Sequence, residues 1–274
     1  MGFPRSSHLQ RFLTAALLIP ALFAYLVWGG PLLFLLLTWA GVLMGAYEYS
    51  RLSAVPSGPH RFVLYAFWGS VTLGAGVLNG LPGLLAGLEI NFLVWAVYQI
   101  LSYRDGEPFF EQVGKDLFGL LYLSLFMPFF VLIRMEPRGL DWIFFLLAVN
   151  YAGDTAAFYT GRIWGRHKLA PAVSPKKTWE GSLGGLAANG LIGWIFQQTL
   201  FPQTAAIEII GLAGLLGVLS QFGDLTESLI KRASGFKDSG VLFPGHGGFL
   251  DRVDSLLLPA PLLYFYITSW WAHP

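Results

Sequence analysis

The sequence predicts an all-α, polytopic membrane protein with about nine transmembrane helices. Only 12% of its 274 residues are charged, whereas soluble domains average roughly 25%, so polar surface is too scarce to cover a soluble globule of this size. Apolar runs of about 20 residues, the length that crosses a bilayer as a helix, also recur along the whole chain.

Nine apolar runs define the expected spans. They cover residues 12–28, 32–49, 62–78, 84–101, 117–133, 142–164, 182–200, 207–230 and 253–271. The first run has the basic start of a signal peptide. Further spans follow it directly across Gly29-Gly30-Pro31, which favours a retained span.

The distribution of basic residues predicts the orientation. With a cytoplasmic N-terminus and nine crossings, 15 of the 17 Lys and Arg residues face the cytoplasm, and only Arg134 and Arg138 face the other side. Cytoplasmic loops of membrane proteins carry such an excess of positive charge. The net charge of +1 gives no electrostatic basis for binding nucleic acid, and the absence of cysteine excludes thiolate metal sites.

The two halves of the chain differ in polarity. Residues 1–139 form a predicted scaffold of about five helices with few polar groups. Glu48 and Glu89 lie near span ends there, where a headgroup-level position is the simplest interpretation. Residues 140–274 form a predicted catalytic region of about four helices, because ionisable side chains accompany each of its spans.

Residues 224–254 are the most polar stretch of the chain. Its carboxylates are Asp224, Glu227, Asp238, Asp251 and Asp254, and its basic residues are Lys231, Arg232, Lys237 and Arg252. His246 stands among Pro244, Gly245, Gly247 and Gly248, which favour tight backbone turns. So many charges between apolar spans indicate a functional site.

The eighth predicted span carries one polar stripe. Its members recur at spacings of three and four, and so share one helix face: Ser220, Asp224, Glu227, Ser228 and Lys231. Asp251 and Asp254 open the ninth span at the same membrane side, so Asp224 and Asp251 can converge. Carboxylates in a basic surround suit Mg²⁺ bound to a polyphosphate. The alternative is a structural network of salt bridges.

Two further stretches carry candidate site residues. Asp154 lies four residues after Asn150 in the apolar sixth span, where burying an unpaired carboxylate is energetically costly. It is therefore either part of the functional site or a partner in an interhelical hydrogen bond. Ser174, Lys176, Lys177 and Thr178 precede the seventh span and can form a phosphate cradle at its N-terminus, or simply anchor the chain. Glycines 181, 185 and 193 predict close helix packing.

The polar stretch closely resembles the signature of the phosphatidate cytidylyltransferases, also called CDP-diacylglycerol synthases. The matching positions are Ser228, Lys231, Arg232, Lys237, Asp238, Gly240, Phe243, Pro244, His246, Gly247, Gly248, Phe249, Asp251, Arg252 and Asp254. Residues 153–158 and 174–181 also resemble that family, and the resemblance covers roughly residues 140–260.

The resemblance implies a reaction in which CTP and phosphatidic acid give CDP-diacylglycerol and pyrophosphate. It also implies Mg²⁺, a K⁺ ion in some members, and a homodimer. Together with the charge bias, it implies a multi-pass protein of a bacterial inner membrane whose active site faces the cytoplasm.

The residues receive expected roles on this basis. Asp224 and Asp251 are the expected metal ligands. The other expected catalytic residues are Lys237, Asp238 and His246. The expected substrate-binding residues are Asp154, Ser174, Lys176, Lys177, Thr178, Lys231, Arg232, Arg252 and Asp254. The lipid phosphate is already an anion, so the reaction needs charge neutralisation and positioning more than a strong base.

Two other functions compete with this interpretation. A CTP-dependent lipid kinase would transfer the γ-phosphate to a lipid alcohol and would need a base for the hydroxyl group. A secondary transporter would bind a coupling ion at Asp154 and Asp224. The signature disfavours the kinase. The polar groups lie toward one membrane side rather than at the midplane, which disfavours the transporter.

Overall fold

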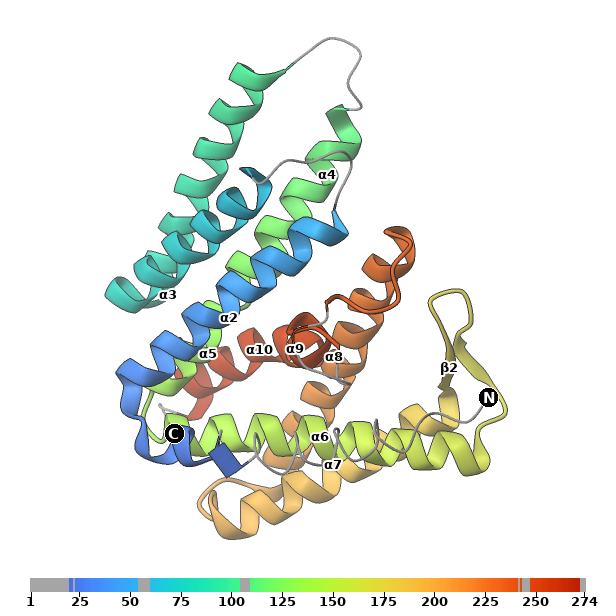
Figure 1. The fold of residues 1–274 in the computed structure, drawn as a ribbon. Coiled ribbons are helices and arrows are strands. Elements are labelled where there is room, and N and C mark those ends of the chain that lie inside the picture. The colour runs from blue at the N-terminus through green and yellow to red at the C-terminus, as the bar shows by residue number, and fades with distance from the viewer. Residues whose placement is uncertain are drawn as a thin grey trace. The chain divides into compact units, whose positions relative to one another are not determined.

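A computed structural model describes residues 20, 21, 23–53, 60–103, 109–240, 242 and 247–271. The described chain is mostly helical (Figure 1). It divides into two compact units, Met1–Leu132 with Asp238–Leu250 (unit 1) and Ile133–Lys237 with Asp251–Pro274 (unit 2). Most of the first predicted span lies outside the described residues, although residues 23–28 are helical.

Unit 1 holds the N-terminal helices. They are α2 (Gly30–Leu52), α3 (His60–Ser102), α4 (Phe109–Gly119), the π-helix η1 (Leu120–Leu125) and α5 (Pro128–Met135), whose last turn passes into unit 2. Residues 109–135 are nearly continuous helix, interrupted before Pro128, whose nitrogen has no hydrogen to donate. This helix replaces the shorter fifth span predicted at 117–133.

The helix α3 is a helical hairpin. It is broken at Asn79 and at Gly80, where φ is 61° and ψ is −144°, a conformation that glycine adopts readily. Tyr65 Oη and Gln99 Nε2, from the two arms, donate hydrogen bonds of 2.9 and 3.0 Å to the carboxylate of Asp116 on α4. The arms therefore lie together, which confirms that the third and fourth predicted spans are separate helices.

Unit 2 holds the C-terminal helices and a short sheet. Its elements are α6 (Gly139–Trp164), β1 (Lys168–Ala170), β2 (Ser174–Thr178), α7 (Trp179–Thr199), α8 (Ala206–Ala233), α9 (Leu250–Leu257), α10 (Pro259–Tyr266) and the π-helix η2 (Ile267–Trp271). The ninth predicted span, 253–271, is interrupted at Leu258, ahead of Pro259. The prediction of a purely helical protein needs one correction, because part of the predicted basic loop forms an antiparallel hairpin of β1 and β2.

The helices α6 and α7 run side by side (Figure 1), and glycine makes their close approach possible. A Cβ at Gly185 would lie only 2.9 Å from the backbone oxygen of Gly153 on α6. Gly193, two turns along α7, meets Ala213 and Ile210 of α8 in the same way. The predicted packing role of these glycines is confirmed.

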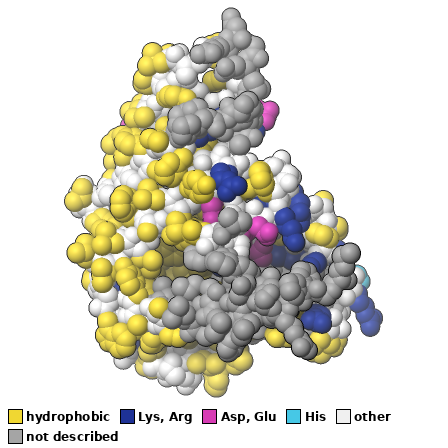
Figure 2. Space-filling model, viewed as in Figure 1, with side chains coloured by type: hydrophobic (Ala, Val, Ile, Leu, Met, Phe, Trp, Pro, Cys, Tyr) yellow, Lys and Arg dark blue, Asp and Glu magenta, His cyan; other side chains and the backbone are white. Residues whose placement is uncertain are grey.

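Large apolar side chains remain exposed on the helices, as expected for contact with lipid. Examples are Phe67 on α3 and Leu215 on α8, and hydrophobic side chains cover much of the face shown in Figure 2. Within the described residues, four helical stretches are long and apolar enough to cross a membrane: Gly30–Leu52, Arg61–Ser102, Phe109–Met135 and Ala206–Ala233. The count of nine spans and the cytoplasmic N-terminus stay predictions.

The glycine contacts give a stability prediction. Gly185→Ala should lower the apparent unfolding midpoint in detergent, because the new methyl group meets backbone that cannot move aside without separating α6 from α7. Gly211→Ala on α8 is the matched control, because a Cβ there has open space and alanine favours a helix by about 1 kcal/mol over glycine. Equal midpoints for the two variants would contradict this packing.

Candidate functional site

A buried hydrogen-bond network joins three helices of unit 2. Asn150 on α6 donates from Nδ2 to the hydroxyl of Ser255 on α9 at 3.2 Å, and its Oδ1 accepts from the hydroxyl of Ser220 on α8. All three residues are at most 5% exposed. Buried polar groups that satisfy one another in this way fix the register of the helices.

Each residue of this network lies four positions from a predicted site carboxylate. Asn150 precedes Asp154, Ser220 precedes Asp224, and Ser255 follows Asp251. Residues four apart share a helix face, about one turn from each other. The network therefore holds the carboxylates of α6, α8 and α9 in register beside it.

The carboxylates form a cluster, here called the carboxylate cluster: Asp154, Asp224, Glu227, Asp251 and Asp254. Asp154, Asp224 and Asp254 are near enough to repel one another electrostatically. The backbones of α8 and α9 touch, because a Cβ at Gly223 would overlap the backbone oxygen of Asp254. Three helices thus bring acidic residues near one another, and the convergence of Asp224 and Asp251 at one cation stays a prediction.

Two lysines form ion pairs with carboxylates of this cluster. Lys177 Nζ on β2 lies 2.6 Å from Asp224 Oδ2, and Asp224 also accepts a 3.3 Å hydrogen bond from the Ser228 hydroxyl. Lys231 Nζ lies 2.6 Å from Asp251 Oδ1 and pairs with Glu227 as well. Arg252 is within electrostatic range of Asp154. Basic side chains gather on the face that carries the hairpin (Figure 2).

Glu227 is a member of the cluster that the sequence did not assign to the site. Its side chain is only 1% exposed and it is held by Lys231, which also binds Asp251. The sequence did place Glu227 on the polar stripe of α8, three residues after Asp224. That spacing was the available signal, because it predicts a common helix face.

The other predicted residues lie on β2, on or just after α8, or outside the described residues. Lys176 is exposed on β2, and Ser174 is half-buried at the start of that strand. Arg232 Nε donates to the backbone oxygen of Val173 at 3.4 Å. Lys237 and Asp238 are exposed and follow α8. His246 lies outside the described residues.

The N-terminus of α7, where the sequence predicts a phosphate cradle, holds two side chains that bind backbone nitrogens. Thr178 is buried and caps the helix, its hydroxyl accepting a 3.1 Å hydrogen bond from Gly181 N. The Glu180 carboxylate accepts from the backbone nitrogens of Arg166 and His167 at 3.1 and 3.2 Å, and its Oε1 lies 2.6 Å from His167 Nδ1. Thr178 and Glu180 therefore fasten the hairpin to α7, which positions Lys177.

Glu180 lies ahead of the predicted seventh span, and its pKa is lowered to about 2. The main causes are its own backbone N–H at the start of α7 and the hydrogen bond with His167. The carboxylate therefore remains charged over the physiological pH range, and it continues to accept hydrogen bonds from Arg166 and His167.

The cluster has the chemistry of a cation site but not a finished coordination shell. All its donors are carboxylate oxygens, the ligands that Mg²⁺ prefers, and its five carboxylates outnumber Lys177, Lys231 and Arg252. Across the described ranges, however, no group of three acidic or histidine side chains is arranged to hold a metal ion. The ammonium groups of Lys177 and Lys231 contact the carboxylates instead.

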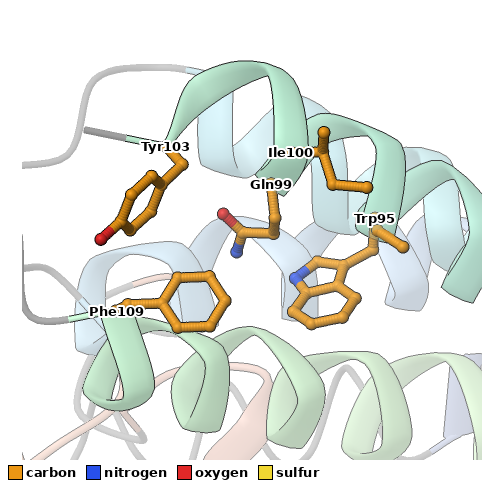
Figure 3. A pocket seen from close by; sticks show the side chains of 6 residues that line it. Trp95, Gln99, Ile100, Tyr103 and Phe109 are labelled. Carbon is orange, nitrogen blue, oxygen red and sulfur yellow. The ribbon is translucent and has the colours of Figure 1, made fainter. Parts of the chain in front are cut away.

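A groove in unit 1 has a different character (Figure 3). It has a volume of about 440 Å³ and is lined by Trp95, Ala96, Gln99, Ile100, Tyr103 and Phe109. Its lining carries no charged side chain, and the amide of Gln99 already donates to Asp116. It therefore lacks the cations that a triphosphate would require.

The sequence matches the model of the cytidylyltransferase family over residues 9–270. This chain belongs to that family. It is 38% identical over 264 residues to the phosphatidate cytidylyltransferase of Brucella suis, covering 95% of this chain and 93% of the relative. The enzymes of the same name from Pseudomonas aeruginosa and Bacillus subtilis are 35% and 32% identical, with coverage of 92% and 94% of this chain and 94% and 97% of those relatives.

The segments that resemble the family signature and the family match differ in extent. The carboxylate cluster lies on the segments whose residues resemble the family signature. The matches extend beyond the signature to nearly the whole chain, so the N-terminal helices belong to the family as well.

The buried network gives a second prediction. Asn150→Ala should leave the hydroxyls of Ser220 and Ser255 without their shared partner, at a cost of about 1–3 kcal/mol. The apparent unfolding midpoint should fall clearly, whereas Thr199→Ala, which removes only a local hydrogen bond at the exposed end of α7, should change it little. An Asn150→Ala midpoint equal to that of the control would contradict the network.

The Glu180 contacts give a third prediction, which concerns pH. A lowered pKa means that the ionised carboxylate stabilises the hairpin above the ordinary pKa of a glutamate, and that this stabilisation is lost as the pH falls toward 2. The backbone amide protons of Arg166 and His167 should stay protected from exchange with solvent down to about pH 3. Glu180→Gln should remove that pH dependence, while unchanged protection in this variant would refute the contact.

Proposed function

We propose that this chain transfers the cytidylyl group of CTP to phosphatidic acid, giving CDP-diacylglycerol and pyrophosphate for phospholipid synthesis. The observation that carries the proposal is the pairing of Asp224 on α8 with Lys177 and of Asp251 on α9 with Lys231. The shared name of the relatives supports it, because each is a phosphatidate cytidylyltransferase.

The proposed reaction is a substitution at phosphorus. A phosphate oxygen of phosphatidic acid forms a bond to the α-phosphorus of CTP, and the bond from that phosphorus to the oxygen bridging the β-phosphate breaks. Pyrophosphate leaves with the electron pair. The attacking oxygen is already anionic, so the protein must bring two anions together rather than remove a proton.

The carboxylate cluster supplies the proposed cation site. Asp224 and Asp251 would hold Mg²⁺, with Glu227 and Asp254 beside them. When bound, Mg²⁺ neutralises triphosphate charge and draws electron density from the phosphate that is attacked. A K⁺ ion near the same carboxylates is part of the proposal, because the acidic groups of the cluster outnumber its cations.

The basic residues supply the rest of the charge neutralisation. Lys177 and Lys231 already stand at the carboxylates and would bind the phosphates of CTP and of the lipid, with Lys176, Arg232 and Arg252 near them in sequence. Ser174 would donate from its hydroxyl. The Thr178 hydroxyl caps α7 by accepting from Gly181 N, and its own hydrogen would be available to donate to a phosphate.

Three residues of the signature complete the proposed site from the segment after α8. Lys237 and His246 would bind the departing pyrophosphate, and Asp238 would orient one of these cations. Positive charge aimed at the leaving group stabilises the transition state, in which negative charge builds up there.

The proposed setting is a multi-pass protein of a bacterial inner membrane with its active site on the cytoplasmic side. CTP would then enter from the cytosol and phosphatidic acid from the bilayer. The bias of basic residues toward that side supports this orientation. A homodimer is also proposed, on the basis of the resemblance to the family.

The decisive test uses CTP labelled either at the α-phosphorus or at the γ-phosphorus. Purified protein with phosphatidic acid and Mg²⁺ should transfer label from the α-phosphorus of CTP into lipid, and none from the γ-phosphorus. Asp224→Asn and Asp251→Asn should each lower this transfer by about 100-fold or more, because each removes one anionic donor from the cation site. Chelation of divalent cations should abolish it.

Asp141→Asn is the matched control for these variants. Asp141 is a carboxylate at the start of α6, paired with Arg138 at 2.8 Å and distant in sequence from the cluster residues. It should keep nearly full activity. Transfer of the γ-label to diacylglycerol would instead identify a lipid kinase, and the absence of any transfer by folded protein would refute an enzymatic function.

A further inference from the structure

Glu48 is a buried carboxylate of α2 that the signature does not include. It is only 3% exposed, so the protein buries this carboxylate away from water. A carboxylate removed from water needs hydrogen bonds or an opposite charge. The described residues that donate hydrogen bonds to Glu48 also belong to unit 1, but they lie far along the sequence, between Asp238 and Leu250.

Both oxygens of Glu48 accept hydrogen bonds from the signature segment. Oε1 accepts from the backbone nitrogen of Phe249 at 2.8 Å, and Oε2 accepts from that of Leu250 at 2.9 Å. The Ser239 hydroxyl also donates to Oε2, at 2.8 Å. One side chain thus binds the segment both before and after its undescribed residues 243–246.

The shape of the signature segment fits this contact. A Cβ at Gly240 would lie 2.5 Å from Glu48 Oε1, and a Cβ at Gly248 would lie 2.5 Å from both oxygens. Any other residue at these positions would push the carboxylate away. The Phe249 ring packs against Gly41 of α2, where a Cβ would come within 2.6 Å of it. A polar and an apolar contact therefore fasten the same segment to α2.

The fastened backbone leads directly into the carboxylate cluster. Leu250 is the first residue of α9, and Asp251, the next residue, pairs with Lys231. The first N–H groups of a helix have no partner within that helix. Glu48 accepts from Leu250 and from Phe249 just before it, and so determines where α9 begins and from which point the Asp251 side chain projects.

We propose that Glu48 is a positioning residue for cytidylyl transfer, which fixes the start of α9 so that Asp251 is held in place for its cation. The inference rests on the proposed function of Asp251. Glu48 acts through backbone amides and touches neither substrate nor cation. It extends the functional part of the chain into the N-terminal helices, which the sequence interpreted as scaffold.

Glutamine has nearly the same size as glutamate, but it carries no charge and has only one acceptor oxygen. Glu48→Gln therefore changes the charge and the hydrogen bonding while the size stays nearly the same. A carboxylate accepts at both oxygens, whereas an amide accepts at one end and donates at the other. In either orientation, the glutamine NH₂ group would face the N–H of Phe249 or of Leu250. One of these two contacts must be lost, and the start of α9 should loosen.

The experiment compares Glu48→Gln with Glu89→Gln. Glu89 is exposed on α3 of the same unit, so its replacement makes the same chemical change without the contacts. Glu48→Gln should lower kcat/KM by about 10- to 100-fold and raise the Mg²⁺ concentration for half-maximal activity by a comparable factor, as seen when a residue behind a metal ligand is changed. Glu89→Gln should change neither quantity.

Hydrogen exchange of the cation-free protein provides a readout that does not depend on activity. The amides of Phe249 and Leu250 should exchange faster in Glu48→Gln than in the unmodified protein or in Glu89→Gln. Ser239→Ala removes one of the three hydrogen bonds and leaves Glu48 intact, so it should give a smaller effect in both assays. It also tests the proposal if Glu48→Gln does not fold.

The outcomes separate this proposal from the proposed function. Folded Glu48→Gln with unchanged kcat and Mg²⁺ dependence would overturn the positioning role, even if its unfolding midpoint fell. If Glu48→Gln does not fold, an unchanged Mg²⁺ dependence in Ser239→Ala would overturn it. An unmodified protein without cytidylyl transfer would overturn the proposed function, whereas faster amide exchange in Glu48→Gln would still support the anchoring of α9.

Discussion

Carboxylates in an apolar environment must be matched with donors or cations, and this constraint accounts for most of the described functional structure. Within the two units, Asp116, Asp224, Glu227, Asp251 and Glu48 each have such partners. Except for Glu227, whose partner Lys231 lies on the same helix, each of these carboxylates has a partner on another segment and so ties two parts of the chain together. The interactions that make burial tolerable are therefore also those that position the site.

The site depends on two kinds of anchor. Asn150, Ser220 and Ser255 set the register of α6, α8 and α9 through side chains, so the acidic residues one turn away share a region. Glu48 sets the start of α9 through main-chain amides. The first anchor fixes helix faces and the second fixes a helix end, and Asp251 depends on both.

Lys177 and Lys231 have two roles in this arrangement. Lys177 and Lys231 balance the carboxylates in the protein without substrate, and the same ammonium groups are suited to phosphate. The pairing is partial, because Asp154, Asp224 and Asp254 still repel one another and the carboxylates outnumber the cations. Family membership and the signature favour cytidylyl transfer over the kinase and transporter alternatives, which the individual charges alone could not distinguish.

The sequence by itself determined the helical membrane class, the polar stripe of α8 and the family. These features depend on composition, on spacing within one helix and on a local run of residues, and all three can be read without knowing the fold. The break of α3 at Asn79 and Gly80 could be predicted for the same reason, because the turn residues are local.

Only the tertiary structure decided the partners of these residues. Among the described residues, Glu48 binds donors 191 to 202 positions away. Two of these, Phe249 and Leu250, donate through backbone N–H groups, which every residue except proline carries and no motif can reveal. The β1–β2 hairpin escaped prediction because a short basic segment has no apolar alternation to mark its strands. Glu227 was recognised as part of a stripe, but its place in the site depended on Lys231 reaching across to Asp251 on another helix.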